Sequence, residues 1–304
     1  MNWLDQVIQG ILLGGYYAIL ASGLALLFGV MRVINLAHGD LAILGAFLAL
    51  VLTDHGVDVW VSLAVVLPVM AAGGGLLYLG VLERSLRSGV LVPLLSTFGL
   101  AIVIENLLFE KFGADQRSFF SSIGTLAYSS WQVTSQITIG KLDVIILCTA
   151  IGVLGGLQIF LSRTSLGRAM RATAEDPDTA ELVGVNSRAV YAMATALALA
   201  TAALAGVFLG MRQTFDPYAG QAQLIFAFEA VVIGGMTLWG TLVGGIVLGI
   251  AQTVGNQMVA EGWLKDVWGG AGAGHVVFLV VLAGRLIYGA LEERGGVRTV
   301  LGRA

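Results

Sequence analysis

Polar groups interrupt an apolar stretch near the N-terminus, in "RVINLAHGDLAILGAF". They lie within nine residues of one another: Arg32, Asn35, His38, Gly39 and Asp40. Asp40 is expected to cap a helix that starts here, because a carboxylate accepts backbone N–H groups at a helix start. Asn35 and His38 either complete a broken helix or line a translocation pathway, since irregular backbone inside a membrane needs polar partners or water.

Two carboxylates, Glu105 and Glu229, fall inside other apolar stretches. An ionised carboxylate in hydrocarbon costs on the order of 3 kcal/mol, so each should face the bundle interior or water and find a partner. Arg285, in the last apolar stretch, is one possible counter-charge. Thr97 and Asn106 share a stretch with Glu105 and add a hydroxyl and an amide. These residues either cap and pack helices or form the polar wall of a pathway.

The composition places these groups in a membrane. Of 304 residues, 57% are hydrophobic and 12% are charged, and the mean hydropathy is +0.89. A soluble domain averages about 25% charged residues. No soluble fold of this size can hide so much apolar surface, so the chain is an integral membrane protein. Asp5 and the lack of a basic start favour retention of the first apolar segment over cleavage as a signal peptide.

Apolar segments of roughly 20 residues are expected to span the bilayer. The candidates are 5–30, 59–82, 90–112, 142–162, 189–211, 241–259 and 274–291. Two shorter stretches, 41–53 and 224–238, adjoin glycine-bearing polar residues and are expected to be half-helices or spans completed by irregular backbone, as occurs near a translocation pathway. The predicted fold is an all-α, polytopic transmembrane bundle of eight or nine spans in a single domain, residues 1–304, with one or two broken or short helices.

Glycines four residues apart recur in these segments and allow helices to approach closely within lipid. The pairs are Gly10/Gly14, Gly152/Gly156, Gly206/Gly210, Gly240/Gly244 and Gly245/Gly249. They predict a tightly packed bundle. In the connection at 113–140, the alternating apolar residues of "WQVTSQITI" predict a short strand pair.

The positions of Lys and Arg predict the orientation, because they concentrate in cytoplasmic loops. With the N-terminus outside, the inside segments hold Arg32, Arg84, Arg87, Arg163, Arg168, Arg171, Arg188, Arg294, Arg298 and Arg303. The outside segments hold only Lys111, Arg117, Lys141, Arg212 and Lys265. An odd number of spans then places the C-terminus in the cytoplasm.

The connection at 163–188 is predicted to fold as two short helices on the cytoplasmic face. Ser165 is expected to cap the first. Asp176 is expected to cap the second, with Pro177 at its first position, and Gly184 to end it in a left-handed conformation. The small apolar patch on these helices either docks into a partner's groove or belongs to an ordinary solvated loop.

No enzymatic motif is present in the sequence. It contains no G-x-x-x-x-G-K-[ST] loop for ATP and no H-E-x-x-H, its three histidines lack ligand spacing, and no serine lies in a G-x-S-x-G turn. The single cysteine excludes an intrachain disulfide. We therefore expect no catalytic residues, no metal, no cofactor and no nucleic-acid partner.

Four stretches resemble one family in order and spacing: "GLALLFGVMRVINLAHGDLAILGAF", "STFGLAIVIEN", "SLGRAMRATAEDPDTAELVGVN" and "VVIGGMTLWGTLVGGIVLG". They are similar to the LivH-like permease subunits of bacterial ABC importers for branched-chain amino acids. The resemblance implies a bacterial inner-membrane importer with a second, LivM-like permease, two cytoplasmic ATPases and a periplasmic substrate-binding protein. Glu229 departs from the basic or neutral residue that many relatives have there.

The resemblance also implies a role for the connection at 163–188, as the loop that docks on the ATPase. The residues that it assigns to this coupling loop are Arg168, Glu175, Asp176, Ala180, Glu181 and Gly184. Alternatives remain open at this point. Glu105, Glu229 or Asp40 would serve an ion-coupled secondary transporter, and similar permeases carry urea or short amides.

Overall fold

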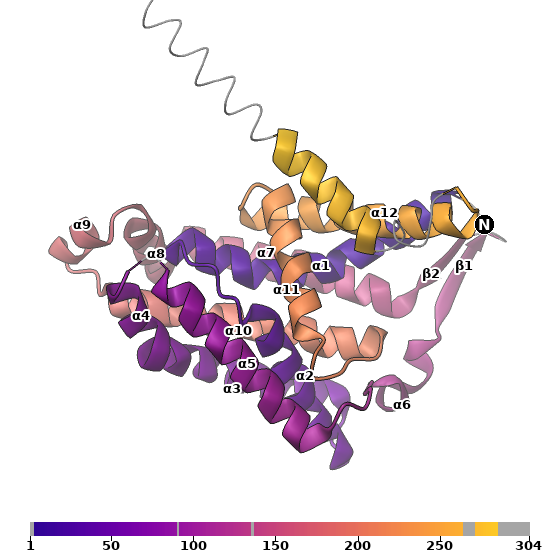
Figure 1. Ribbon diagram of the computed structural model, residues 1–304, viewed down its shortest axis with the longest axis horizontal. Helices are drawn as coiled ribbons and strands as arrows, with labels where there is room; N and C mark the ends of the chain where they lie inside the picture. The colour runs from indigo at the N-terminus through magenta and orange to yellow at the C-terminus, as the bar shows by residue number, and fades with distance from the viewer. Residues whose placement is uncertain (1–2, 90, 135–136, 264–270, 285–304) are drawn as a thin grey trace, which may run out of the picture.

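The computed structural model describes residues 3–89, 91–134, 137–263 and 271–284, and it is a helical bundle with one β-hairpin (Figure 1). The longer helices are α1 (Trp3–Met31), α2 (His38–Asp54), α3 (Val59–Leu77), α5 (Val92–Phe112), α7 (Lys141–Arg163), α10 (Ser187–Arg212), α11 (Gly220–Ile233) and α12 (Leu238–Ala260). The shorter elements are α4 (Glu83–Arg87), α6 (Phe120–Ile123), α8 (Ser165–Glu175), α9 (Pro177–Leu182), β1 (Ser130–Thr134) and β2 (Ile137–Gly140). A further helix covers Ala271–Gly284.

Six of these helices are long and apolar enough to cross a membrane, and they match six of the seven long segments predicted. They are α1, α5, α7, α10, α12 and the continuous run Val59–Arg87, in which a π-helical turn joins α3 to α4. The seventh predicted span, 274–291, is described only as far as Gly284. Arg285, Lys265 and the arginines of the C-terminal segment also lie outside the described residues.

The two short segments are helices, as predicted, but one boundary was wrong. The stretch 41–53 lies within α2. The stretch 224–238 is not one helix, because α11 ends at Ile233 and a turn precedes α12. Gly235 and Met236 have φ angles of 76° and 61°, in the left-handed region that a right-handed helix cannot contain.

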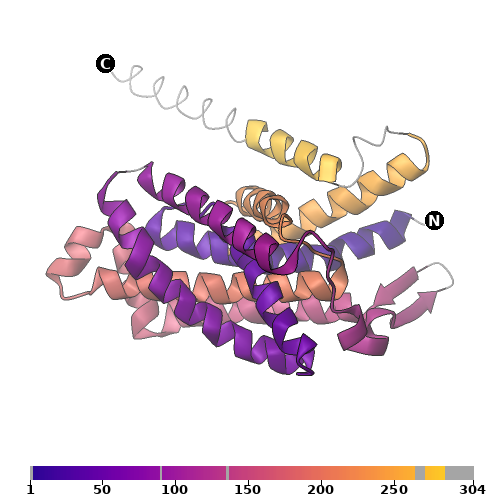
Figure 2. The ribbon, with the colours of Figure 1, turned by 60° about the horizontal axis from the view of Figure 1, so that its bottom comes forward.

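Helices α1 and α10 form the centre of the bundle. Figures 1 and 2 show them side by side and running in opposite directions. In the most apolar 18-residue part of each helix, the share of residues that are buried is 89% in α1 and 72% in α10. The corresponding share is only 28% in α5 and 22% in α7. The outer helices therefore present apolar surface to lipid or to another protein, whereas α1 and α10 pack against other parts of this chain.

Glycines allow α1 and α12 to pack with their backbones in contact. A Cβ on Gly10 would lie 2.5 Å from Ile250 Cα, and one on Gly245 would lie 2.6 Å from the carbonyl oxygen of Gly14. The predicted pairs on these two helices thus do pack closely. Gly152 and Gly156 on α7 differ, because a Cβ on either would meet nothing within 4 Å in the part of the chain described.

The connections gather at two opposite ends of the bundle. Figure 1 shows α4, α8 and α9 at one end, and β1, β2, α6 and the N-terminus at the other. The predicted strand pair is confirmed as an antiparallel hairpin. Near it, Arg117 and Phe215 exchange two backbone hydrogen bonds of 2.8 Å. The end that carries α8 and α9 is called the inner end below.

Gly14→Leu should destabilise the protein, because the new side chain would collide with the backbone of α12. Overpacking of a tight contact costs about 1–3 kcal/mol. Gly152→Leu is the matched control, since open space surrounds that position and little change is expected. Thermal unfolding of the purified protein in detergent measures both. Equal melting temperatures for the two variants would contradict the α1–α12 contact.

Candidate translocation site and coupling loop

The chain turns back into the bundle after α1. Residues 32–37 carry it from the inner end of α1 to the middle of that helix, where His38 Nε2 lies 2.8 Å from the carbonyl oxygen of Leu20. Asn35 Oδ1 accepts the Ala37 N–H at 3.0 Å, and Thr97 Oγ1 accepts the Leu36 N–H at 3.1 Å. Asn35, His38 and Thr97 are all fully buried. These side chains thus bond two backbone amides of the return, as a chain inside lipid requires, whereas Asn35 Nδ2 and His38 Nδ1 have no hydrogen-bond partner among the described residues.

The expectation that Asp40 caps α2 is wrong. The N-cap is Ala37, which supplies no side-chain bond, and Asp40 lies inside the first turn. A cap must precede the helix, and here Asn35 supplies the acceptor from two residues earlier than Ala37. Asp40 is almost fully buried, and its Oδ1 has no hydrogen-bond partner among the described residues. Arg32, in contrast, is exposed, with a left-handed φ of 53°.

A second return of the chain brings the start of α11 next to the start of α2. Residues 213–219 follow α10, and α11 begins at Gly220, in contact with the first turn of α2. A Cβ on Gly39 would overlap the carbonyl oxygen of Gly220, and a Cβ on Gly220 would overlap the Asp40 carboxylate. Positions 39 and 220 therefore both require glycine, which has no Cβ. Two short helices thus start beside each other in the interior, with a buried carboxylate at their junction.

Two tyrosines of α1 form hydrogen bonds to neighbouring helices, one to the short helix α11 and one to α12. Tyr16 donates to Gln223 Oε1 on α11, and Tyr17 donates to Gln252 Oε1 on α12, each at 2.6 Å and buried. Sequence reasoning missed these bonds. The available signal was the tyrosines themselves, because a buried phenol normally has a hydrogen-bond partner.

Glu229 pairs with a residue that sequence reasoning had set aside. Its side chain is 3% exposed, and its Oε1 bonds His275 Nδ1 on the Ala271–Gly284 helix. The His275 ring also stacks on Phe226 of α11, with ring centroids 6.0 Å apart. Glu229 Oε2 has no partner among the residues described. The partner of Glu229 in the structure is thus a histidine, whereas the proposed counter-charge Arg285 lies outside the described residues.

The remaining predicted pathway residues lie on α5, apart from Thr97 and toward the surface. Glu105 is half-buried, and Asn106 is exposed and donates to the carbonyl oxygen of Ile102 at 2.7 Å. Next to them, α2 and α5 enclose an apolar cavity of about 220 Å³ whose walls include Phe47 and Phe112. The structure therefore gathers Asn35, His38, Gly39, Asp40 and Thr97 at one place, with Glu105 close enough to interact electrostatically with Asp40, and leaves Asn106 and Glu229 separate from it.

The coupling loop has the two predicted helices, with one cap displaced by a residue. Thr164, not Ser165, caps α8, because the Thr164 hydroxyl accepts the Gly167 N–H at 2.9 Å. Asp176 caps α9 as predicted. The Thr179 hydroxyl and the Thr179 and Asp178 N–H groups donate to its carboxylate and hold the pKa of Asp176 below its usual value. Gly184 follows with φ of 87°, as expected.

The side chains of the loop divide into a buried and an exposed set. Ala180 is 3% exposed and therefore packs against the chain itself. Leu182 and Val183 at the end of α9 are 87% and 77% exposed. Arg168, Glu175 and Glu181 are exposed around them. The exposed apolar side chains of the loop are thus Leu182 and Val183 at the end of α9 and Leu166 on α8, and Ala180 packs against the rest of the chain.

Comparison with known proteins identifies the family. The sequence profile described as "Branched-chain amino acid transport system / permease component" matches residues 6–286. The chain belongs to this family. The permease is 30% identical over 279 residues to the branched-chain amino acid transport permease BraD of Pseudomonas aeruginosa, covering 88% of this chain and 90% of BraD. It is 32% identical over 281 residues to LivH of Escherichia coli K12, with the same coverage.

A more distant relative is a sugar permease. The permease is 28% identical over 173 residues to the fructose import permease FrcC of Rhizobium meliloti, covering 53% of this chain and 47% of FrcC. The BraD and LivH matches extend over nearly the whole bundle, which contains both chain returns and the coupling loop. The permease is accordingly a multi-pass membrane component of an ABC import system.

His275→Ala should destabilise the permease, because it leaves the buried Glu229 carboxylate without its partner. An unsatisfied buried group costs about 1–3 kcal/mol. The double variant Glu229→Leu/His275→Ala should recover much of this loss, since apolar replacement of a buried pair is often neutral. Thermal unfolding in detergent tests the pair. A double variant that is less stable than His275→Ala alone would contradict the assignment.

Proposed function

We propose that the permease carries a small aliphatic amino acid of the branched-chain type inward across the bacterial inner membrane. The observation that carries this proposal is the nearly full-length match to BraD and LivH, whose names state branched-chain amino acid transport. The apolar walls of the cavity between α2 and α5 suit an aliphatic side chain. The match to FrcC covers half of the chain and gives weaker support to a sugar.

The pathway in this proposal passes the junction of α2 and α11. Helix starts inside a membrane direct the positive ends of their dipoles at the pathway in transporters with broken helices. Here both starts, the buried Asp40 carboxylate and the Asn35, His38 and Thr97 side chains lie at one place. Polar groups at this depth give a zwitterionic solute partners that hydrocarbon lacks.

The proposed assembly contains a second, LivM-like permease, two cytoplasmic ATPases and a periplasmic substrate-binding protein. Separate ATPases are needed because the sequence has no phosphate-binding loop of its own. The outward face of α5 offers apolar surface for lipid or the second permease, at Leu91, Leu95, Phe98, Ile102 and Leu107. The N-terminus is placed outside and the C-terminus in the cytoplasm, because the arginines of α4, α8 and the start of α10 gather at the inner end.

The coupling loop docks on the ATPase through Leu182 and Val183 in this proposal. Two exposed apolar side chains at the tip of a short helix are suited to a groove on a partner. Two capping interactions fix the shape of the tip: the Asp176 cap before it and the left-handed Gly184 after it. Movement of the ATPase is then transmitted through α8 and α9 to the helices that they contact.

The proposed function is tested by uptake into cells that express the permease with the other components of its system. Leucine, isoleucine and valine should accumulate, and deletion of the ATPases should abolish accumulation. Accumulation that survives the deletion would instead support an ion-coupled transporter. If urea, a short amide or fructose were the only solute accumulated, the proposed substrate class would be wrong, but the role as an importer subunit would stand.

Leu182→Asp/Val183→Asp should leave the permease folded but uncoupled. Both side chains are exposed, so stability is expected to change by less than about 0.5 kcal/mol. Uptake should fall at least tenfold, because an apolar docking contact is replaced by charge. Tyr128→Asp, at another exposed apolar position, is the matched control and lies at the opposite end of the bundle. Normal uptake in the double variant would remove these two residues from the docking site.

A further inference from the structure

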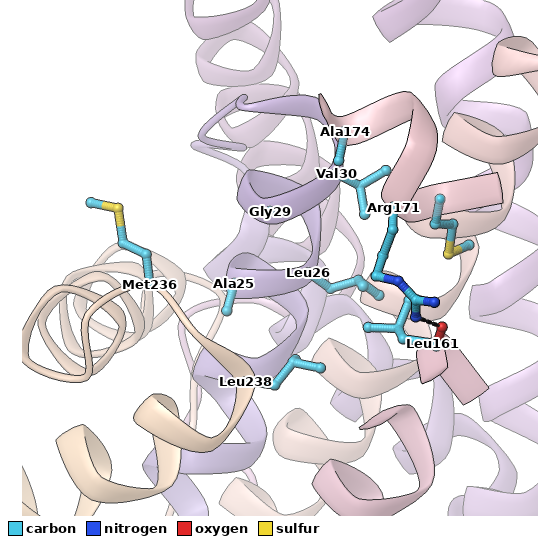
Figure 3. Close-up of a pocket in the computed structure, with 10 residues that line it drawn as sticks. Ala25, Leu26, Gly29, Val30, Leu161, Arg171, Ala174, Met236 and Leu238 are labelled. Carbon is cyan, nitrogen blue, oxygen red and sulfur yellow. Dashed lines mark hydrogen bonds between the residues drawn. The ribbon is translucent and has the colours of Figure 1, made fainter. Parts of the chain in front are cut away.

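A second cavity lies at the inner end, away from the junction of α2 and α11. It measures about 130 Å³, is partly open, and is lined by α1, α7, α8 and the turn between α11 and α12 (Figure 3). Its walls are apolar at Leu26, Val30, Leu161, Met170, Met236 and Leu238. An apolar cavity of about 150 Å³ takes a ligand the size of benzene. This cavity therefore has room for a short aliphatic group of about five or six carbon atoms.

One charged side chain, that of the exposed residue Arg171, lines this cavity. Figure 3 shows the Arg171 guanidinium between Leu26 and Leu161, where it donates to the carbonyl oxygen of Leu161. A guanidinium has five N–H donors, and Arg171 has no ion pair with any described acid. None of the ten described residues that line the cavity is acidic. A carboxylate is the natural partner for such a group, because it accepts two parallel N–H bonds from one guanidinium.

We propose that this cavity binds a short, branched aliphatic carboxylate from the cytoplasm. Arg171 binds the carboxylate, and the alkyl group lies between Leu26, Val30 and Met236. The absence of an acid among the described lining residues disfavours an intact amino acid, whose ammonium group would have no partner. Exchange of the amino group of a branched-chain amino acid for an oxo group, as in transamination, leaves a carboxylate that carries the same branched alkyl group.

The position of the cavity gives the bound carboxylate an effect on transport. This step rests on the proposed function, which supplies the cytoplasmic orientation and the docking role of the loop. The ligand contacts α1, the coupling helix α8 and the turn that contains Met236, so it favours the arrangement in which these three stay together. Coupling requires α8 to follow the ATPase. The bound carboxylate therefore slows ATP-driven uptake, as an inhibitor that acts from the inside.

The test uses the complete transporter, purified through a tag on this chain, with 4-methylpentanoate as the probe. Equilibrium dialysis measures its binding, and ATP hydrolysis in nanodiscs measures its effect. Arg171→Gln removes the guanidinium, and Gly29→Leu fills the cavity, since open space surrounds Gly29 on the cavity wall. Arg163→Gln is the charge control. Gly73→Leu is the filling control, because Gly73 also has open space but does not line the cavity.

The expected result is saturable binding that weakens about tenfold or more in Arg171→Gln and Gly29→Leu and is unchanged in both controls. Inhibition of ATP hydrolysis should disappear in the same two variants. Leucine and 4-methylpentan-1-ol should displace the bound 4-methylpentanoate only at concentrations at least tenfold higher than unlabelled 4-methylpentanoate requires. Equal binding of the alcohol would overturn the role of Arg171, and no binding at millimolar concentration would overturn the site. Normal ATP-driven uptake of the solute by the same transporter in sealed proteoliposomes would show that the proposed function stands regardless.

Discussion

Backbone N–H and C=O groups inside a bilayer must be satisfied within the protein, and the structure of this permease depends on how it meets that requirement at its two chain returns. In the return at 32–37, Asn35 and Thr97 accept the amides of Ala37 and Leu36, and the His38 ring bonds the carbonyl oxygen of Leu20. The return at 213–219 delivers α11 to the same place, where Gly39 and Gly220 allow the two helix starts to touch. The two breaks therefore meet at one place, and the buried Asp40 carboxylate lies at their junction.

The surrounding helices keep this junction in place. Helices α1 and α12 meet through glycines, and Tyr16 and Tyr17 add two buried hydrogen bonds to α11 and α12. The inner end is built differently. There α8 and the turn at Gly235 and Met236 enclose a cavity against α1, so their contact is less tightly packed. This arrangement suits the proposed coupling, in which separate ATPases move the permease through α8 and α9 while its centre stays rigid.

Local signals allowed much of this structure to be predicted from the sequence. Long apolar runs gave six spans, and the Asp176 cap and the left-handed Gly184 were correct because each depends on only a few neighbouring residues. Asp40 was wrongly predicted to cap α2. Sequence order alone does not show that the Asn35 side chain, and not that of Asp40, accepts a backbone N–H at the start of this helix, from Ala37. The pair Glu229–His275 joins residues 46 positions apart, and Tyr16–Gln223 joins residues 207 apart. Such partners are fixed by packing of the whole bundle, which no short motif encodes.

Hydrogen exchange of the backbone at the first chain return tests this account most directly. The amides of Leu36, Ala37 and His38 are bonded within the chain, and Ala37 and His38 are fully buried, so peptides that cover them should exchange as slowly as those from the middle of α1. Peptides from the exposed coupling loop at 176–186 provide the fast reference in the same sample. Exchange at 36–38 as fast as in that loop would contradict an internally satisfied break at the centre of the permease.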